Sequence, residues 1–280
     1  LIDVGDEVIY PNPGFPIYES MINFVNGKAV PCPLREVNGF ALDPQDLISR
    51  ITPKTKMVIL NSPANPTGGV TERAELEAVL KVLKDYPDIW ILSDEIYSRM
   101  LYDNIEHVSP MQDPEIRDRV ILLDGWSKTY AMTGWRMGFG VMRPDLAKSF
   151  TKLMVNSNSC TASFSQRAGM EALAGDQSGV DAMLAEFDVR RTHIVNLLND
   201  IPGVNCHLPV GAFYVFPNIK EFGLSSIDMQ DRILSEAGVA CLAGTSFGAE
   251  GEGYIRFSYA NSIENIEEGV GRVRRFLENI

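Results

Sequence analysis

The chain has 280 residues, of which 45% are hydrophobic and 22% are charged, and its formal net charge is −12. This composition is typical of a soluble globular protein with one large domain or two smaller ones. The negative charge argues against nucleic acid and against an anionic membrane surface as partners. No apolar run approaches the roughly 18 residues of a membrane span. An anionic ligand would therefore have to be bound by local groups, against the overall field.

The cysteines and histidines are too dispersed to form a metal site. Four cysteines and three histidines are scattered along the chain without a Cys-x-x-Cys pair. This pattern predicts reduced thiols, with neither a disulfide framework nor a bound metal. Residues 1–7 have no basic start and no apolar signal core. We therefore expect a cytoplasmic protein.

Short apolar runs alternate with helical patterns in the first half of the chain. Strands that alternate with helices indicate a mostly parallel sheet covered by helices on both faces, an α/β fold. A helix is predicted to begin at Pro44 with Asp43 as its cap, and another to begin after Thr71 as its cap. The predicted strands are 8–10, 28–31, 57–60, 90–92, 120–123 and 139–141, and the longer helices are 18–26 and 71–84.

The pattern changes after residue 144. Two long helices are predicted there, and the elements that follow them are shorter, as is typical of a separate α+β module. We therefore predict a large domain at 1–176 and a small domain at 177–280. The predicted helices are 144–174, 180–201, 229–237 and 263–277, and the predicted strands are 211–216, 239–242 and 254–258.

The most informative segment is Ser-Lys-Thr-Tyr-Ala-Met-Thr-Gly-Trp-Arg, residues 127–136. Lys128 follows the strand 120–123, at the edge of the sheet where open α/β folds bind ligands. Partial shielding from water weakens a lysine's preference for its charged form, so the amine can become a nucleophile. Arg136 can hold a phosphate through two parallel hydrogen bonds. A lysine Schiff base to pyridoxal phosphate uses both groups.

This segment resembles the cofactor-lysine signature of the class I aminotransferases, the aspartate aminotransferase superfamily with the type I pyridoxal-phosphate fold. The Met-Thr-Gly-Trp-Arg wording, residues 132–136, resembles the bacterial aspartate/aromatic/prephenate branch. The resemblance extends over essentially the whole chain. It implies a large domain with a mostly parallel sheet between helices, and a small α+β carboxy-terminal domain. It also implies that Lys128 forms the Schiff base and that Arg136 binds the phosphate.

Three further residues match the family at the ends of predicted strands. Asn65 lies in Asn-Pro-Thr-Gly, where the family asparagine donates a hydrogen bond to the ring oxygen of the cofactor. Asp94 resembles the aspartate that keeps the pyridine nitrogen protonated, since the ring then accepts electrons. Tyr97 resembles the tyrosine that hydrogen-bonds the ring oxygen and lowers the pKa of the Schiff base. The neighbouring Glu95 is interpreted as structural.

The remaining matches concern the cofactor ring, the phosphate and the substrate. Phe15, in Pro-Gly-Phe-Pro, matches the aromatic residue that stacks on the ring, where the family often has tryptophan. Ser127 is expected beside the phosphate. Arg256 lies in an apolar strand, where a guanidinium is costly without an anion. It matches the arginine that binds the substrate α-carboxylate, and Asn65 is expected to contact the substrate as well as the cofactor.

The resemblance implies transfer of an amino group between an L-amino acid of the aspartate, aromatic or alanine kind and a 2-oxo acid, in a homodimer. Family members carry a further amino-terminal region, including a turn and helix that bind the phosphate, before the point that matches Leu1. We therefore expect a chain that lacks the first part of its large domain and binds pyridoxal phosphate weakly. Alternatives are a β-lyase of the same fold, a ligand-sensing aminotransferase-like domain of a transcription regulator, and an inactive fragment.

Overall fold

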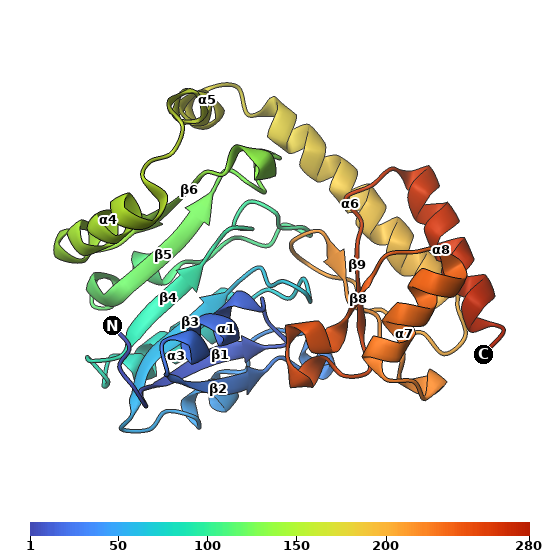
Figure 1. Cartoon of the computed structure of the whole chain (residues 1–280), viewed down its shortest axis with the longest axis horizontal. Coiled ribbons are helices and arrows are strands. Elements are labelled where there is room, and N and C mark those ends of the chain that lie inside the picture. Colours follow the sequence, from blue (N-terminus) through green and yellow to red (C-terminus); the bar gives the residue numbers. More distant parts are fainter.

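A computed structural model describes all 280 residues. The first half of the chain forms a six-stranded sheet in the order β2-β1-β3-β4-β5-β6 (Figure 1). All neighbouring strands from β2 to β5 pair in parallel, whereas β6 is antiparallel to β5. This arrangement agrees with the α/β class and the mostly parallel sheet predicted above. The strands are β1 (Glu7–Asn12), β2 (Lys28–Pro33), β3 (Thr55–Asn61), β4 (Trp90–Asp94), β5 (Val120–Gly125) and β6 (Gly138–Val141).

Each face of the sheet has its own apolar core, because successive side chains of a strand point to opposite faces. Met57 packs on the face covered by α1 (Ile17–Phe24). Val58 packs on the opposite face, in the same core as the buried side of α3 (Arg73–Leu83). Met57 and Val58 are consecutive in β3 and therefore contribute to the cores on opposite faces of the sheet.

The helix starts of the first half agree only in part with the predictions. Asp43 accepts a hydrogen bond from the backbone of Gln45 and caps α2 (Pro44–Ile48), as predicted. Thr71 does not cap α3, so that prediction is wrong. Its backbone amide donates to Ser62 Oγ at 2.8 Å, which keeps Thr71 in the loop after β3, and Glu72 precedes the helix without a side-chain capping bond.

The predicted single helix at 144–174 is wrong, because the chain turns at Ser159. The segment forms α4 (Pro144–Asn158) and α5 (Ser163–Ala174), and Ser159 between them has a φ of +64°. Serine and asparagine side chains at the end of α4 bond to the backbone and compete with helix propagation. The helix predicted next is present as α6 (Ser178–Asn199).

The last part of the chain forms a second, three-stranded sheet in the order β7-β9-β8. It packs with the helices α6, α7 and α8 on one side of the molecule (Figure 1). Two of its strands, β7 and β8, are only two residues long. They are shorter than the predicted strands 211–216 and 239–242, and each begins three residues later than predicted. The elements are β7 (Tyr214–Val215), α7 (Ser226–Arg232), β8 (Leu242–Ala243), β9 (Ile255–Ser258) and α8 (Ile263–Leu277).

The core of this second part includes residues from the first. Tyr97, Met100 and Tyr102, which follow β4, are buried in the same cluster as the inner sides of α6 and α8. The loop after β4 therefore joins the two sheets through apolar packing. The division into domains at 176/177 stays a prediction.

One face of the molecule is open. All four residues of β6 are exposed, and α4 has no buried residue. A cavity of about 1470 Å³ lies between β6, α4 and α5, with Trp135, Phe139 and Phe164 in its lining. None of the helices combines the length and the apolar character needed to cross a membrane.

Removing two methyl groups from the core of the sheet should destabilise the fold. Val58 is completely buried in β3, whereas Val37 is 85% exposed. We predict that Val58→Ala lowers the free energy of unfolding by about 2 kcal/mol, since it leaves a cavity in a packed core. The matched variant Val37→Ala should change it by less than about 0.5 kcal/mol. Urea unfolding followed by circular dichroism measures both, and equal midpoints for the two variants would contradict the described core.

Candidate active site

The candidate site lies where β3, β4 and β5 end side by side. These strands are parallel, so their carboxyl ends meet at one edge of the sheet. Asn61 of β3 pairs in register with Asp94 of β4, and Asp94 pairs with Leu123 of β5. Lys128 follows in the turn after β5. The structure therefore brings together Asn61 and Lys128, which are 67 positions apart in the sequence.

Lys128 presents its amine to an aromatic wall. Its Nζ lies 5.7 Å from the ring centroid of Tyr97 and 5.4 Å from that of Phe213. Burial lowers the pKa of Lys128, and the positive charges of Arg256 and Arg136 lower it further, against the opposing effect of Asp94. A larger fraction of the amine is therefore neutral than in a solvated lysine, and neutral amine is the form that attacks a carbonyl.

Asp94 is held by two donors. The hydroxyl of Tyr18 donates to Oδ2 at 2.6 Å, and the backbone amide of Ile96 donates to Oδ1 at 3.3 Å. Burial raises the pKa of Asp94, whereas both hydrogen bonds and the charge of Lys128 lower it. The side-chain amide of Asn61 fixes the same strand end by donating to the backbone oxygen of Asp94 at 3.2 Å. The carboxylate thus has one orientation, on the face of the sheet that carries α1.

Arg256 reaches the site from β9 and lies between two aromatic rings. Its guanidinium carbon is 4.4 Å from the ring centroid of Tyr214 and 4.7 Å from that of Phe247. The hydroxyls of Tyr214 and Tyr97 are 3.0 Å apart. These contacts connect the second sheet to the turn after β4, and they place Arg256 on the same side of the site as the aromatic wall of Lys128.

The guanidinium of Arg256 has no acidic partner. Nη1 donates to Asn65 Oδ1 at 3.0 Å, but the buried Nε has no hydrogen-bond partner. Burial lowers the pKa of Arg256. Because Nη1 is engaged, Nε and Nη2 are left on one edge of the guanidinium, and that edge matches the two oxygens of a carboxylate. A buried donor on a cation is unfavourable without a partner, so an anion bound at this point would stabilise it.

The other three predicted site residues lie toward the rim. Arg136 is exposed, has a left-handed backbone (φ +55°) and donates from Nη1 to the backbone oxygen of Thr133 at 2.8 Å. Ser127 is half-buried beside Lys128. Phe15 is 43% exposed in the loop between β1 and α1, with its ring centroid 6.0 Å from that of Tyr18. No hydrogen bond or ion pair joins these three residues to one another.

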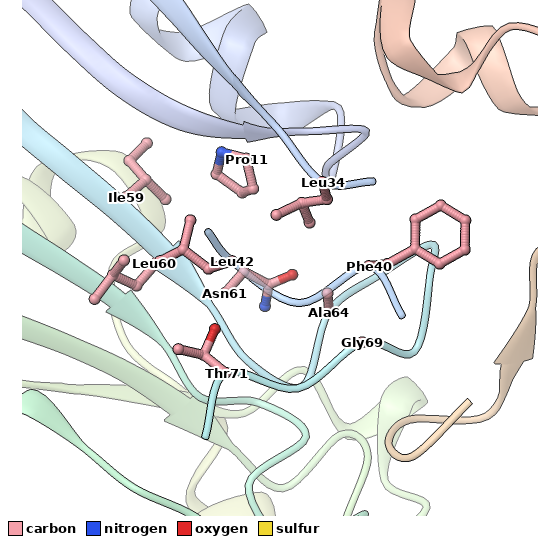
Figure 2. A pocket seen from close by; sticks show the side chains of 10 residues that line it. All are labelled: Pro11, Leu34, Phe40, Leu42, Ile59, Leu60, Asn61, Ala64, Gly69 and Thr71. Carbon is pink, nitrogen blue, oxygen red and sulfur yellow. The ribbon is translucent and has the colours of Figure 1, made fainter. Parts of the chain in front are cut away.

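Two cavities near the site differ in what they can hold. Figure 2 shows a pocket lined by residues of β1, β3 and the loops after β2 and β3, where Asn61 and Thr71 are the polar side chains among apolar ones. Its volume of about 20 Å³ is enough for one water molecule and excludes a cofactor. The much larger open cavity beside β6 has Arg136 in its lining, together with Asp124 and Ala131. Space for a phosphate-sized group is therefore present on the side of Arg136.

Three residues of the site were not identified from the sequence. Tyr18, Asn61 and Tyr214 make hydrogen bonds to Asp94 or Tyr97 in the structure. Only the position of Asn61, at the last residue of an apolar run, marks it as a residue at the edge of the sheet. The partners of Tyr18 and Tyr214 are 76 and 117 positions away, so no local pattern indicates them.

The residues fit pyridoxal phosphate. The cofactor needs an amine that is readily deprotonated, an anion for its pyridine nitrogen and cationic donors for its phosphate. Lys128 and Asp94 have the first two properties, and Arg136 lies beside open space. The unpartnered edge of Arg256 provides for a further anion, separate from the cofactor.

Comparison with known proteins gives the same family. The model of the family "Aminotransferase class I and II" matches residues 1–273. An aspartate aminotransferase of Pyrococcus horikoshii is 41% identical over 281 residues, which cover 99% of this chain and 71% of the relative. The solved aromatic aminotransferase of Pyrococcus horikoshii superimposes with a TM-score of 0.96 at 36% identity, covering 100% of this chain and 75% of that one.

A third comparison extends the likeness to bacteria. The solved aspartate aminotransferase of Rhizobium meliloti has a TM-score of 0.94 at 34% identity, and the match covers 99% of this chain and 72% of that one. These matches confirm the family predicted from residues 127–136 and the type I fold. The chain therefore belongs to the class I and II aminotransferases, pyridoxal-phosphate-dependent enzymes that move an amino group between an amino acid and a 2-oxo acid.

Proposed function

We propose that Lys128 is the Schiff-base lysine of this aminotransferase and that Arg256 binds the α-carboxylate of the amino acid. The observation that carries the proposal is the pairing of a lysine whose pKa is lowered by burial with an arginine whose buried Nε has no partner. Lys128 then supplies the amine that the cofactor requires. Arg256 supplies the anion site that a substrate requires.

Asp94, Asn65 and Tyr97 would hold the ring of the cofactor. Asp94 is oriented by Tyr18 and Ile96, so its carboxylate can keep a pyridine nitrogen protonated. The buried side chain of Asn65 and the hydroxyl of Tyr97 are the polar groups available for the ring oxygen. When bound, pyridoxal phosphate supplies an electron-accepting ring that stabilises negative charge at the α-carbon of the substrate.

The phosphate and the open face of the ring would be held at the rim. Arg136 is the cation nearest to the large cavity, and Ser127 is the adjacent hydroxyl. Phe15 offers an aromatic surface in the loop after β1. The exposure of Arg136 leaves its guanidinium free to turn toward an anion, since its only bond is to the backbone oxygen of Thr133.

The protein's own groups bind the substrate and move the proton. Arg256 fixes the α-carboxylate through Nε and Nη2, while Asn65 holds Nη1 and so fixes the plane of the guanidinium. Lys128 Nζ, whose pKa is lowered by burial, would take the proton from the α-carbon as a general base in its neutral form and would then give it to the C4′ carbon of the cofactor as a general acid. The rings of Tyr97 and Phe213 keep water from the amine.

The substrate proposed is an amino acid of the aspartate, aromatic or alanine kind. Its support is the names of the relatives, which include aspartate and aromatic aminotransferases. Those names also favour amino transfer over the β-elimination of a lyase and over a sensor role. A homodimer and a cytoplasmic location stay predictions, and so does the division into domains at 176/177.

Replacing Lys128 with alanine should remove covalent cofactor binding and amino transfer. The purified chain would be incubated with pyridoxal phosphate, reduced with borohydride, digested and examined by mass spectrometry. We expect the label on the peptide that contains Lys128, and no label at that site in Lys128→Ala. Amino transfer to 2-oxoglutarate would be measured in parallel, with the exposed Lys81→Ala as the matched control. Amino transfer by Lys128→Ala at the control's rate would refute the assignment.

Replacing Arg256 with glutamine should change both pH dependence and substrate affinity. Arg256 lowers the pKa of Lys128, so its loss raises that pKa, and half-maximal reaction with pyridoxal phosphate should move to higher pH. The loss of a charged hydrogen-bonding partner should also weaken amino acid binding about 10- to 100-fold. Absorbance titrations at several pH values measure both effects. Exposed Arg73→Gln is the control, and a downward shift of the pH midpoint in Arg256→Gln would contradict the described electrostatics.

A further inference from the structure

A buried carboxylate lies beneath the site, on the opposite face of the sheet from Asp94. Glu95 is 4% exposed, and its Oε1 accepts hydrogen bonds from Ser93 Oγ at 2.8 Å and Ser109 Oγ at 2.6 Å. Its Oε2 is 2.6 Å from His107 Nε2. Ile91 of β4 packs in the core that includes the buried side of α3, and Ser93 lies two residues further along the strand, on the same face. The cluster therefore faces α3.

The cluster holds a loop in place and has no activated nucleophile. Both serine hydroxyls donate to Glu95, and neither is hydrogen-bonded to His107, so the histidine does not activate a serine nucleophile. Ser109 also accepts from the backbone amide of Met111 at 3.2 Å and so fixes the start of a 3₁₀ turn. A buried carboxylate without these donors would be costly, so the loop that carries them is held against the end of β4.

The backbone of Glu95 connects this anchor to the site. Its amide donates to the backbone oxygen of Leu123 on β5 at 2.8 Å. Its carbonyl accepts from the amide of Ser98 at 2.8 Å and closes the turn that contains Tyr97. Asp94 lies between Ser93 and Glu95, whose side chains are both fixed below the sheet, so the backbone that aims its carboxylate has little freedom.

We propose that Glu95, with Ser93, His107 and Ser109, is a positioning residue that sets the orientation of Asp94 and Tyr97 toward the cofactor. The proposal rests on the roles assigned to those two residues under the proposed function. Glu95 itself lies on the far face of the sheet and touches neither cofactor nor substrate. Its effect is transmitted through the backbone from Ser93 to Ser98.

The test compares two buried carboxylates of the same sheet. Glu7 is 5% exposed at the start of β1, at the opposite edge from the site, and is bonded to Lys28 and Thr52. Glu95→Ala and Glu7→Ala both remove a buried hydrogen-bonded carboxylate. For each variant, the dissociation constant of pyridoxal phosphate would be measured by fluorescence titration and the stability by the urea midpoint. We expect both to lose stability and only Glu95→Ala to bind the cofactor about tenfold more weakly.

Two further variants make the result decisive. Glu95→Gln can still accept both serine hydroxyls and should restore most of the cofactor affinity, and Ser109→Ala, a milder change, should weaken it about threefold. Equal loss of cofactor affinity in Glu7→Ala and Glu95→Ala would overturn the inference. Asp94→Asn separates it from the proposed function. If Asp94→Asn binds the cofactor normally, the role of Asp94 is wrong, and if only Glu95→Ala binds normally, the positioning role is wrong.

Discussion

The parallel pairing of β3, β4 and β5 is the constraint on which the site depends. It brings the carboxyl ends of three strands to one edge, so that Asn61, Asp94 and the turn with Lys128 become neighbours. The side chains that convert this edge into a site come from outside it. Tyr18 approaches from α1 on one face, and Arg256 approaches from the second sheet. A one-residue slip in the register of β4 would turn the side chain of Asp94 to the other face of the sheet, away from Tyr18.

Burial is the common physical cause of the unusual charges in the site. It lowers the pKa of Lys128 and of Arg256 and raises that of Asp94, as expected for cations and anions moved out of water. The two cations of the set also disfavour one another's charge. Buried cations without an anionic partner are electrostatically unfavourable. An anionic cofactor and a carboxylate substrate would stabilise them locally, although the protein as a whole has a net charge of −12.

The two faces of β4 have different tasks. Asp94 points to the face with α1, where Tyr18 orients it, and Glu95 points to the face with α3, where three donors surround it. Alternation along a strand makes such a division possible within two residues. Glu95 is buried, as expected for a structural residue. Its hydrogen bonds with Ser93, His107 and Ser109 explain how an ionisable residue can lie in the core.

The sequence by itself determined the family and the strands of the first sheet, because apolar strand runs and the lysine segment are local patterns. It failed where competition between local and distant groups decides, as at Thr71, held in a loop by Ser62, and at Ser159, where one predicted helix becomes two. Only the tertiary structure decided that Tyr18 holds Asp94 and that Asn65 meets Arg256. Those partners are 76 and 191 positions apart, and packing alone brings them within hydrogen-bond distance.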